Sequence, residues 1–348
     1  MVDCMRWHFS MQRPKVIESL AREQGLKIVD VSQLTIRRVR RGKGFSYRNG
    51  TGSIRDKDEL ARLKSLAVPP AYDDVRYAAN PSAHLQAVGT DSAGRLQYRY
   101  HANWTAVREA LKARRLARLA GALPDIKRAV ARALSAADEN AAFAIAAVVH
   151  LVSLTAIRAG GESYAKERGT RGATTLLKSN VRVNGRAMVL EFKAKGGKLM
   201  SKEIRDRRMR AALKRLMALP SRRLFQYRGA DGAVHAVRAS DVNDFLRSIA
   251  GRRISLKDFR TLVASTSALE ALAKTAPETS ERKKRSQLLT AVTAIAEELG
   301  NTPTVCRTSY VHDAVITAFE DGKLARLRKA PRSIRQKAHL LARLVSRP

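Results

Sequence analysis

The stretch AAFAIAAVVHLVSLTAI, from Ala141 to Ile157, is the most apolar part of this 348-residue sequence. It contains His150 and Ser153 and is shorter than a comfortable membrane span, so it predicts a helix buried in a protein core. From Trp104 up to this stretch, Ala, Leu and Arg recur at three- and four-residue spacing, which is the period of a helix with one apolar face. The sequence therefore predicts a mainly helical domain built around this segment.

One segment interrupts the helical pattern. NVRVNGRAMVLEFKAKGGKLMSKEI, Asn180 to Ile204, has an Asn-Gly pair between apolar runs and then a Gly-Gly pair next to Lys195. An Asn-Gly pair in that setting is a strong hairpin signal. We expect an inserted hairpin here, with Lys195 at its tip and helices resuming at about Asp206.

The chain before this helical domain is expected to be β-rich. Short alternating runs at Val75 to Ala79, His84 to Thr90 and Arg95 to His101 are separated by turn sequences. Two further strands, punctuated by glycine, are expected between Ile36 and Ile54, and KDELARLKSLAVPP predicts a short helix stopped by its proline pair. These runs predict a small antiparallel sheet.

The two patterns define the fold class. We expect an α+β protein with a small β-rich N-terminal domain, residues 1–103, and a mainly helical domain with an inserted β-hairpin, residues 104–348. The helical domain ends in a basic amphipathic segment, KLARLRKAPRSIRQKAHLLARLVSRP.

The charge balance indicates a polyanionic partner. The chain has 67 Lys and Arg against 31 Asp and Glu, a formal net charge of +36, which is more than solubility requires. The charges are spread along the chain, so we expect nucleic acid along a large folded surface. An anionic membrane surface is the alternative.

Cysteine usage and the N-terminus suggest a compartment. Cys4 and Cys306 lie far apart and match no CxxC or Cys/His spacing, so neither a disulfide framework nor a zinc site is expected. The start, MVDCMRWHFSMQRPK, lacks the apolar run of a signal peptide. We expect a soluble cytoplasmic protein associated with the nucleoid.

Several residues have settings that suggest chemistry. Arg158 follows the buried helix beside a Gly-Gly pair, where a charge is costly unless it is paired or faces an anion. Arg260 lies in SLKDFRTLVAS, which resembles the start of a core helix, and Tyr310 lies in the proline-containing LGNTPTVCRTSYVHDAV. Taken singly, each also has an ordinary interpretation: an arginine that caps carbonyls, a solvated hairpin lysine or a packed tyrosine.

Taken in order, these segments and RRGKGFSYRNGTGSIRD, AVPPAYDDV and AHLQAVGTDSAGRLQYRYH resemble the type IB DNA topoisomerases of the compact bacterial and poxvirus-like branch. The resemblance covers about residues 26–320. It implies that Tyr310 attacks the scissile phosphodiester, forms a 3′-phosphotyrosyl bond and releases a 5′-hydroxyl. It also implies that the activating groups are Arg158, Lys195, Arg260 and Asn301.

Physical chemistry agrees with those residue types. Guanidinium groups neutralise the charge that gathers on the nonbridging oxygens without a metal. A lysine can protonate the departing 5′-oxygen, and nearby cations favour phenolate character in a tyrosine. The covalent bond conserves the energy of the phosphodiester, and the sequence has no GxxxxGK[ST] motif, so we expect no ATP and no cofactor.

The resemblance also implies a mode of binding. The two domains are expected to close as a clamp around duplex DNA, with the protein acting as a monomer. Tyr98 and Tyr100 either line the DNA-facing surface or pack the sheet. The basic C-terminal segment either adds phosphate contacts or is a solvated helical face.

Two other functions remain open. A tyrosine site-specific recombinase shares the chemistry, but such proteins usually begin with a helical DNA-binding domain rather than a β-rich one. A noncatalytic DNA-binding protein is disfavoured because all five candidate residues are present.

Overall fold

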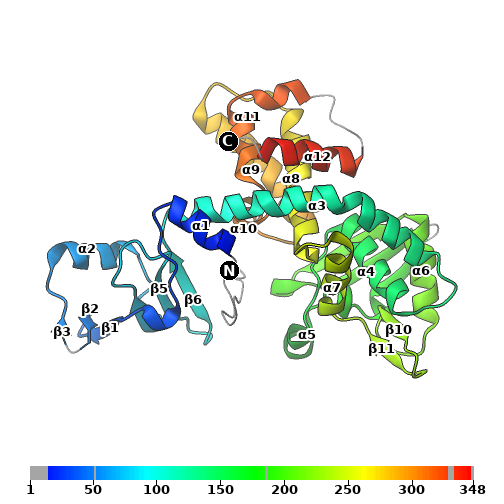
Figure 1. The fold of residues 1–348 in the computed structure, drawn as a ribbon, viewed down its shortest axis with the longest axis horizontal. Coiled ribbons are helices and arrows are strands. Elements are labelled where there is room, and N and C mark those ends of the chain that lie inside the picture. The colour runs from blue at the N-terminus through cyan, green and yellow to red at the C-terminus, as the bar shows by residue number, and fades with distance from the viewer. Residues whose placement is uncertain (1–14, 51, 185–186, 328–332, 346–348) are drawn as a thin grey trace. The chain divides into compact units, whose positions relative to one another are not determined.

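The computed structural model describes residues 15–50, 52–184, 187–327 and 333–345, and the chain divides into two compact units, Met1–Lys112 and Ala113–Pro348 (Figure 1). Cys4, the N-terminal stretch before Lys15 and the glycine of the Asn-Gly pair lie outside the described residues. The expected α+β class is confirmed, since a β-rich region is followed by a mainly helical one.

The first unit is built on an antiparallel sheet of order β3-β2-β1-β4-β5-β6. Its strands are β1 (Ile36–Arg41), β2 (Gly44–Asn49), β3 (Gly52–Ser53), β4 (Asp73–Tyr77), β5 (Leu85–Thr90) and β6 (Leu96–Tyr100). Strand β5 is buried along nearly its whole length because its side chains enter two apolar clusters, Leu85 and Val88 one and Ala87 the other. The strands expected from the alternating runs are all present.

Two helices accompany this sheet. Helix α2 (Lys57–Ser65) begins where the Asp56 carboxylate accepts a hydrogen bond from Glu59 N at 2.7 Å, the usual N-cap arrangement. Helix α1 (Lys15–Glu23) was not expected from the sequence. Its nine residues form too short a pattern to stand out, and it is held by burying Leu20 and Ala21 in a small apolar cluster.

The second unit surrounds α4 (Ala141–Thr155), which is buried on almost every turn, as the apolar stretch predicts. Around α4 lie α6 (Arg207–Ala218), α7 (Ala239–Ala250) and α8 (Leu256–Ala273). The long helix α3 (Trp104–Leu134) begins at the expected residue, and its later turns bury Leu116, Leu119 and Ile126 in the same core.

The inserted sheet consists of β7 (Val181–Asn184), β8 (Ala187–Lys193) and β9 (Leu199–Ile204) in that order. Lys193 pairs with Leu199, so the chain between them forms the tip of the β8-β9 hairpin. A second hairpin, β10 (Gln226–Arg228) with β11 (Val234–Ala236), was not expected because three-residue strands leave no readable alternation.

The C-terminal part of the chain is helical. Its elements are α9 (Glu281–Glu298), α10 (Pro303–Ser309), α11 (Asp313–Glu320) and α12 (Ile334–Val345), with α5 (Glu162–Arg168) earlier in the unit. Helix α12 packs against α8 and α11 (Figure 1). This packing buries Ala338 and Leu341 and pairs Lys337 with Glu270. One face of α12 is therefore core, and Arg335 and Arg343 are exposed on the rest of the helix.

Among the described residues, no helix combines the length and apolar character that crossing a membrane requires.

Candidate active site

Arg260 is a buried cation near the N-terminal end of α8, with only 3% of its surface exposed. Its two terminal nitrogens donate to backbone carbonyls, Nη1 to Ala156 and Nη2 to Leu299 at 3.1 Å. Its Nε has no hydrogen-bond partner among the described residues. Burial disfavours the charged form and lowers the pKa of Arg260, while the neighbouring Tyr310 opposes that shift. A buried donor without a partner marks a place where a further acceptor fits.

Tyr310 is placed by the ends of α10. Thr302 caps the start of the helix, where its hydroxyl accepts from Val305 N at 3.3 Å, and Tyr310 is the residue that caps its end. Ser265 on α8 donates its hydroxyl hydrogen to Tyr310 O at 2.9 Å and accepts from His312 N at 3.1 Å. One hydroxyl therefore fixes the backbone on both sides of the tyrosine, whose side chain is almost fully buried.

The two residues face each other. The Cζ atom of Arg260 lies 5.0 Å from the centre of the Tyr310 ring. Burial raises the pKa of Tyr310, but the positive charges of Arg260, Arg158 and Lys257 together outweigh burial and bring it below its usual value. The phenol is therefore more readily ionised than an ordinary tyrosine, which suits a nucleophile.

Arg158 is carried by the turn that ends α4. Ala156 adopts a left-handed conformation with φ of 51° and stops the helix. The following chain lies against a second backbone segment, where Ala173 N donates to Arg158 O at 2.7 Å. A Cβ at Gly172 would lie 2.6 Å from Arg158 O and 2.5 Å from Gly160 N, and Gly160 has a φ of 95° with a Cβ position 2.7 Å from Thr175 Oγ1, so this approach requires glycine at both positions.

Arg158 contacts Asn301 and its neighbour. Nη2 of Arg158 donates to Asn301 Oδ1, and Nη1 donates to Gly300 O at 3.4 Å. Asn301 is 5% exposed, and its Nδ2 has no partner among the described residues. The structure thus brings Arg158, Arg260, Asn301 and Tyr310 into one cluster with two unpartnered buried donors.

Lys195 lies at the tip of the β8-β9 hairpin, in a short 3-10 turn over Lys195–Gly197. Gly196 in this turn has a φ of 79°, which favours glycine there. Three residues beyond Lys195, Lys198 donates from Nζ to Asn301 O at 3.0 Å. The hairpin tip is therefore attached to the segment that contains Asn301.

Sequence reasoning missed Lys257. It lies on α8 one turn before Arg260, is half-buried, and is among the charges that lower the pKa of Tyr310. The available signal was its three-residue spacing from Arg260, which places both cations on one helix face. Cys306 was not proposed for the site, and burial raises its thiol pKa to about 11, so it is inert at neutral pH.

In the first unit, Tyr98 and Tyr100 stack with their ring centres 6.3 Å apart, and Tyr100 stacks on Trp104 at 6.1 Å. Both tyrosines are half-buried against the apolar cluster that contains Leu85 and Val88. Packing of the sheet accounts for their position.

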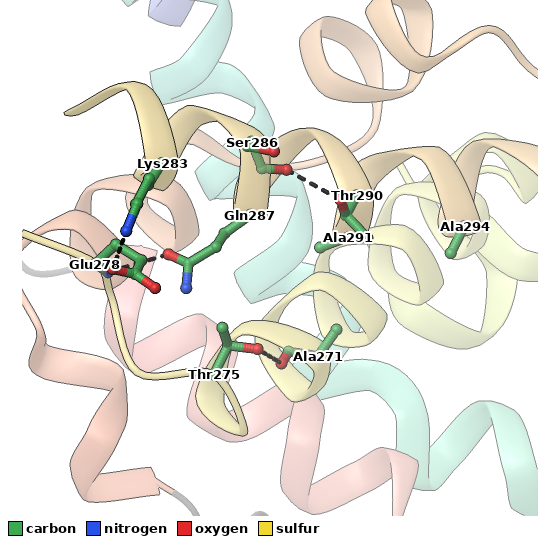
Figure 2. Close-up of a pocket in the computed structure, with 9 residues that line it drawn as sticks. All are labelled: Ala271, Thr275, Glu278, Lys283, Ser286, Gln287, Thr290, Ala291 and Ala294. Atoms are coloured by element: carbon green, nitrogen blue, oxygen red, sulfur yellow. Dashed lines mark hydrogen bonds and ion pairs between the residues drawn. The ribbon is translucent and has the colours of Figure 1, made fainter. Parts of the chain in front are cut away.

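A pocket of about 520 Å³ lies between α9 and the C-terminal end of α8 (Figure 2). It is lined by Ala271, Thr275, Glu278, Lys283, Ser286, Gln287, Thr290, Ala291 and Ala294. Thr275 and Thr290 each donate to the carbonyl four residues earlier in the chain, and Gln287 is bonded to the backbone of the α8-α9 connection. None of the five candidate residues lines the pocket, so we assign it no part in the reaction. In the described parts of the chain, no group of three or more His, Cys, Asp or Glu side chains is placed to hold a metal ion.

Comparison with known proteins identifies the family. The family described as the catalytic core of eukaryotic DNA topoisomerase I matches residues 101–338, and the N-terminal domain of bacterial DNA topoisomerase IB matches residues 44–91. DNA topoisomerase 1B of Acanthamoeba polyphaga mimivirus is 29% identical over 284 residues, which is 80% of this chain and 84% of that protein. The cluster around Tyr310 lies within the first match, and the chain belongs to the type IB family of DNA topoisomerases and is an enzyme of that kind.

Proposed function

We propose that the protein relaxes supercoiled DNA by cutting one strand of the duplex, allowing that strand to rotate, and sealing it again. Tyr310 is the nucleophile in this proposal, and Arg158, Arg260, Asn301 and Lys195 assist it. The reaction needs neither ATP nor a bound metal, because the phosphotyrosyl bond keeps the energy of the phosphodiester and the charge on phosphate is met by side chains.

The observation that carries the proposal is the buried pair of Arg260 and Tyr310, with Cζ 5.0 Å from the ring centre. A buried arginine over a tyrosine of lowered pKa suits attack on an anion, since the same cation favours the phenolate and the phosphorane-like transition state. Two buried donors nearby, Arg260 Nε and Asn301 Nδ2, lack partners among the described residues. Phosphate oxygens are the acceptors that this combination suits.

The cleavage step is a single displacement at phosphorus. The Tyr310 phenol first loses its proton to solvent, and the phenolate oxygen then forms a bond to the scissile phosphorus while the bond from phosphorus to the 5′-oxygen breaks. That oxygen leaves as a hydroxyl when Lys195 supplies a proton. Religation is the reverse reaction, so no net bond is made or lost in a complete cycle.

The positive charge of the whole chain is the basis for the proposed binding of duplex DNA. We infer that the β-rich domain, residues 1–103, and the helical domain, residues 104–348, hold duplex DNA as a clamp and that one protein molecule is sufficient. The net charge of +36 supports an extended contact with phosphates.

The test is relaxation of supercoiled plasmid in EDTA without ATP by the wild-type protein and by Tyr310→Phe. We expect the wild type to produce a ladder of topoisomers and a protein–DNA adduct that resists denaturation. Tyr310→Phe should give neither and should still bind DNA, because only the nucleophilic oxygen is lost.

Tyr227→Phe is the matched control, since Tyr227 is a half-buried tyrosine of β10 and none of the site contacts involves it. It should relax plasmid as the wild type does. An adduct trapped with Tyr310→Phe would place the nucleophile elsewhere, and joints formed only between defined sequences would indicate a recombinase.

A further inference from the structure

Three successive carbonyls ahead of the nucleophile each accept a hydrogen bond from a different cation. Leu299 O accepts from Arg260 Nη2 at 3.1 Å, Gly300 O accepts from Arg158 Nη1 at 3.4 Å, and Asn301 O accepts from Lys198 Nζ at 3.0 Å. The donors come from α8, from the turn after α4 and from the β8-β9 hairpin. We call residues Leu299, Gly300 and Asn301 the carbonyl segment.

The carbonyl segment has little freedom of its own. Asn301 N donates to Ala296 O at 2.7 Å, which holds the segment to the end of α9. Gly300 has a φ of 62°, and a side chain there would lie 2.7 Å from Met200 Sδ. Strand β9 therefore packs directly on Gly300, and Tyr310 follows at the far end of the short helix α10.

The first two residues of β9, Leu199 and Met200, point to opposite faces of the strand. Met200 faces Gly300, whereas Leu199 is 86% exposed. Lys198 precedes the strand and extends its ammonium to Asn301 O across a sequence separation of 103 residues. That bond joins the hairpin tip to the carbonyl segment.

We propose that Lys198 is a positioning residue for the cleavage step. Its bond to Asn301 O holds the hairpin so that Lys195, three residues earlier, meets the departing 5′-oxygen while Tyr310 attacks from the other side of phosphorus. This inference rests on the proposed function, in which Lys195 is the general acid. Lys198 itself transfers no proton.

Backbone contacts at the tip explain how one bond can control Lys195. Ala194 N donates to Lys198 O at 2.7 Å, and Gly197 N donates to Ala194 O at 3.0 Å, so Lys195 lies inside a closed turn. Arg171 N donates to Lys193 O at 2.7 Å and fixes the other side of that turn. Without the Lys198 bond, the hairpin keeps the Arg171 contact and the packing of Met200 on Gly300, but the tip loses its bond to Asn301 O.

The experiment measures single-turnover cleavage of a duplex that carries either oxygen or sulfur at the bridging 5′ position of the scissile bond. A thiolate leaves without a proton, so the sulfur substrate does not require the acid. Lys195→Ala and Lys198→Ala should both cut the oxygen substrate at least about tenfold more slowly than wild type and the sulfur substrate at close to the wild-type rate.

Two further variants separate positioning from proton transfer. The double variant Lys195→Ala, Lys198→Ala should be no slower than Lys195→Ala, because there is no acid left to position. Lys198→Arg should recover most of the rate on the oxygen substrate, since arginine restores a donor to Asn301 O but is too weak an acid to replace Lys195. Lys193→Ala, on the same hairpin and exposed, is the matched control and should behave as wild type.

The inference is overturned if Lys198→Ala is equally slow on both substrates, which would indicate that Lys198 contacts phosphate. It is overturned as well if Lys198→Ala cuts the oxygen substrate as fast as Lys193→Ala does. A third contrary result would be a double variant whose decrease in cleavage rate is the product of the decreases in the two single variants. Failure of the proposed function would look different from failure of this inference. In that case the sulfur substrate would not restore the cleavage rate of Lys195→Ala, or Tyr310→Phe would still form the covalent adduct.

Discussion

The guanidinium of Arg260 and the ring of Tyr310 are in contact inside the core of the helical unit, at 5.0 Å from Cζ to the ring centre. Burial raises the pKa of the phenol, and Arg260 is the largest of the charges that lower it. The pKa of Tyr310 therefore lies below its usual value only while those cations are present. In the proposed reaction, we therefore expect Arg260 to help set the pH at which cleavage becomes fast.

The pH dependence of cleavage gives the first prediction. If the phenolate attacks, the single-turnover rate should rise with pH and reach its plateau below the ordinary tyrosine pKa of about 10. Arg260→Ala removes the main charge that favours the phenolate and leaves burial in place, so the rising part of the profile should extend to higher pH. Ultraviolet titration, as the difference between wild type and Tyr310→Phe, should report the same shift without DNA. An unchanged profile in Arg260→Ala would contradict this role.

The second prediction concerns rate at a fixed pH near neutrality. Arg158→Ala and Arg260→Ala should each slow cleavage by about 100-fold or more, the usual effect of losing one preorganised donor to transition-state charge. Lysine at either position should restore little, since a single ammonium cannot reproduce the paired contacts of a guanidinium. Both variants should remain slow on the bridging-sulfur substrate, because charge stabilisation is still required there.

Arg247→Ala is the control for these arginines. Arg247 lies on α7, is exposed and pairs with Asp244, so its removal should leave the cleavage rate unchanged. Rates near wild type in Arg158→Ala or Arg260→Ala would show that the arginine only supports the fold.

Much of the fold was accessible from sequence, for physical reasons. The apolar segment that becomes α4 has very few polar residues, so burial is its stable setting, and the alternating runs bounded by turn sequences predict the strands of the first unit. Helix α1 and the β10-β11 hairpin were missed because they are too short for periodicity to be visible.

The candidate site was only partly accessible. Arg158, Arg260 and Tyr310 stood out by their settings, Asn301 followed from the family resemblance, and the structure brings the four together. The hydrogen bond from Lys198 to Asn301 joins residues 103 positions apart, and its acceptor is a backbone oxygen. A pattern of side chains in the sequence therefore does not predict it. Lys257 was missed because its contribution is a charge at a distance and not a bond.

The third prediction tests the carbonyl segment through Gly300. Gly300→Ala should lower the free energy of unfolding by about 1 to 2 kcal/mol, because an L-residue is strained at φ of 62° and its Cβ would lie 2.7 Å from Met200 Sδ. Cleavage should fall further than stability alone explains, since three cations are aligned on this segment. Thermal unfolding and single-turnover cleavage at a temperature where the variant is folded would measure the two effects.

Combining that change with Met200→Ala separates its causes. The smaller side chain removes the clash but not the backbone strain, so the double variant should recover only part of the loss. Full recovery would show that φ at Gly300 is unimportant. Gly322→Ala is the comparison, because Gly322 has a φ of 70° but its nearest neighbour is at 4.0 Å.

The fourth prediction concerns DNA affinity. Binding to nonspecific duplex should weaken steeply with salt, with a log–log slope of about −0.9 for each phosphate contacted. Removing the C-terminal segment is not a clean test, because Ala338 and Leu341 are core residues. Arg335→Gln with Arg343→Gln alters only the exposed face of α12 and should make the slope shallower by up to about 2 if both touch phosphate.

Whether α12 contacts phosphate is decided by comparing the salt slope of the Arg335→Gln, Arg343→Gln variant with the salt slope of Arg247→Gln on α7. Equal slopes would show that α12 is a packing element whose outer charges meet only solvent. A flat salt dependence in the wild type would instead contradict extended phosphate contact by the whole protein.

The carbonyl segment has a consequence for how this enzyme varies between species and under mutagenesis. Its acceptors are main-chain oxygens, which every amino acid possesses, so exchanging Leu299 for another apolar residue leaves all three bonds available. Alanine scanning would report only the packing of the buried Leu299 side chain, and comparison of related sequences would record no conserved acceptor for Lys198. Only chemical synthesis that replaces one amide by an ester, a weaker acceptor, would expose how strongly each carbonyl orders its cation.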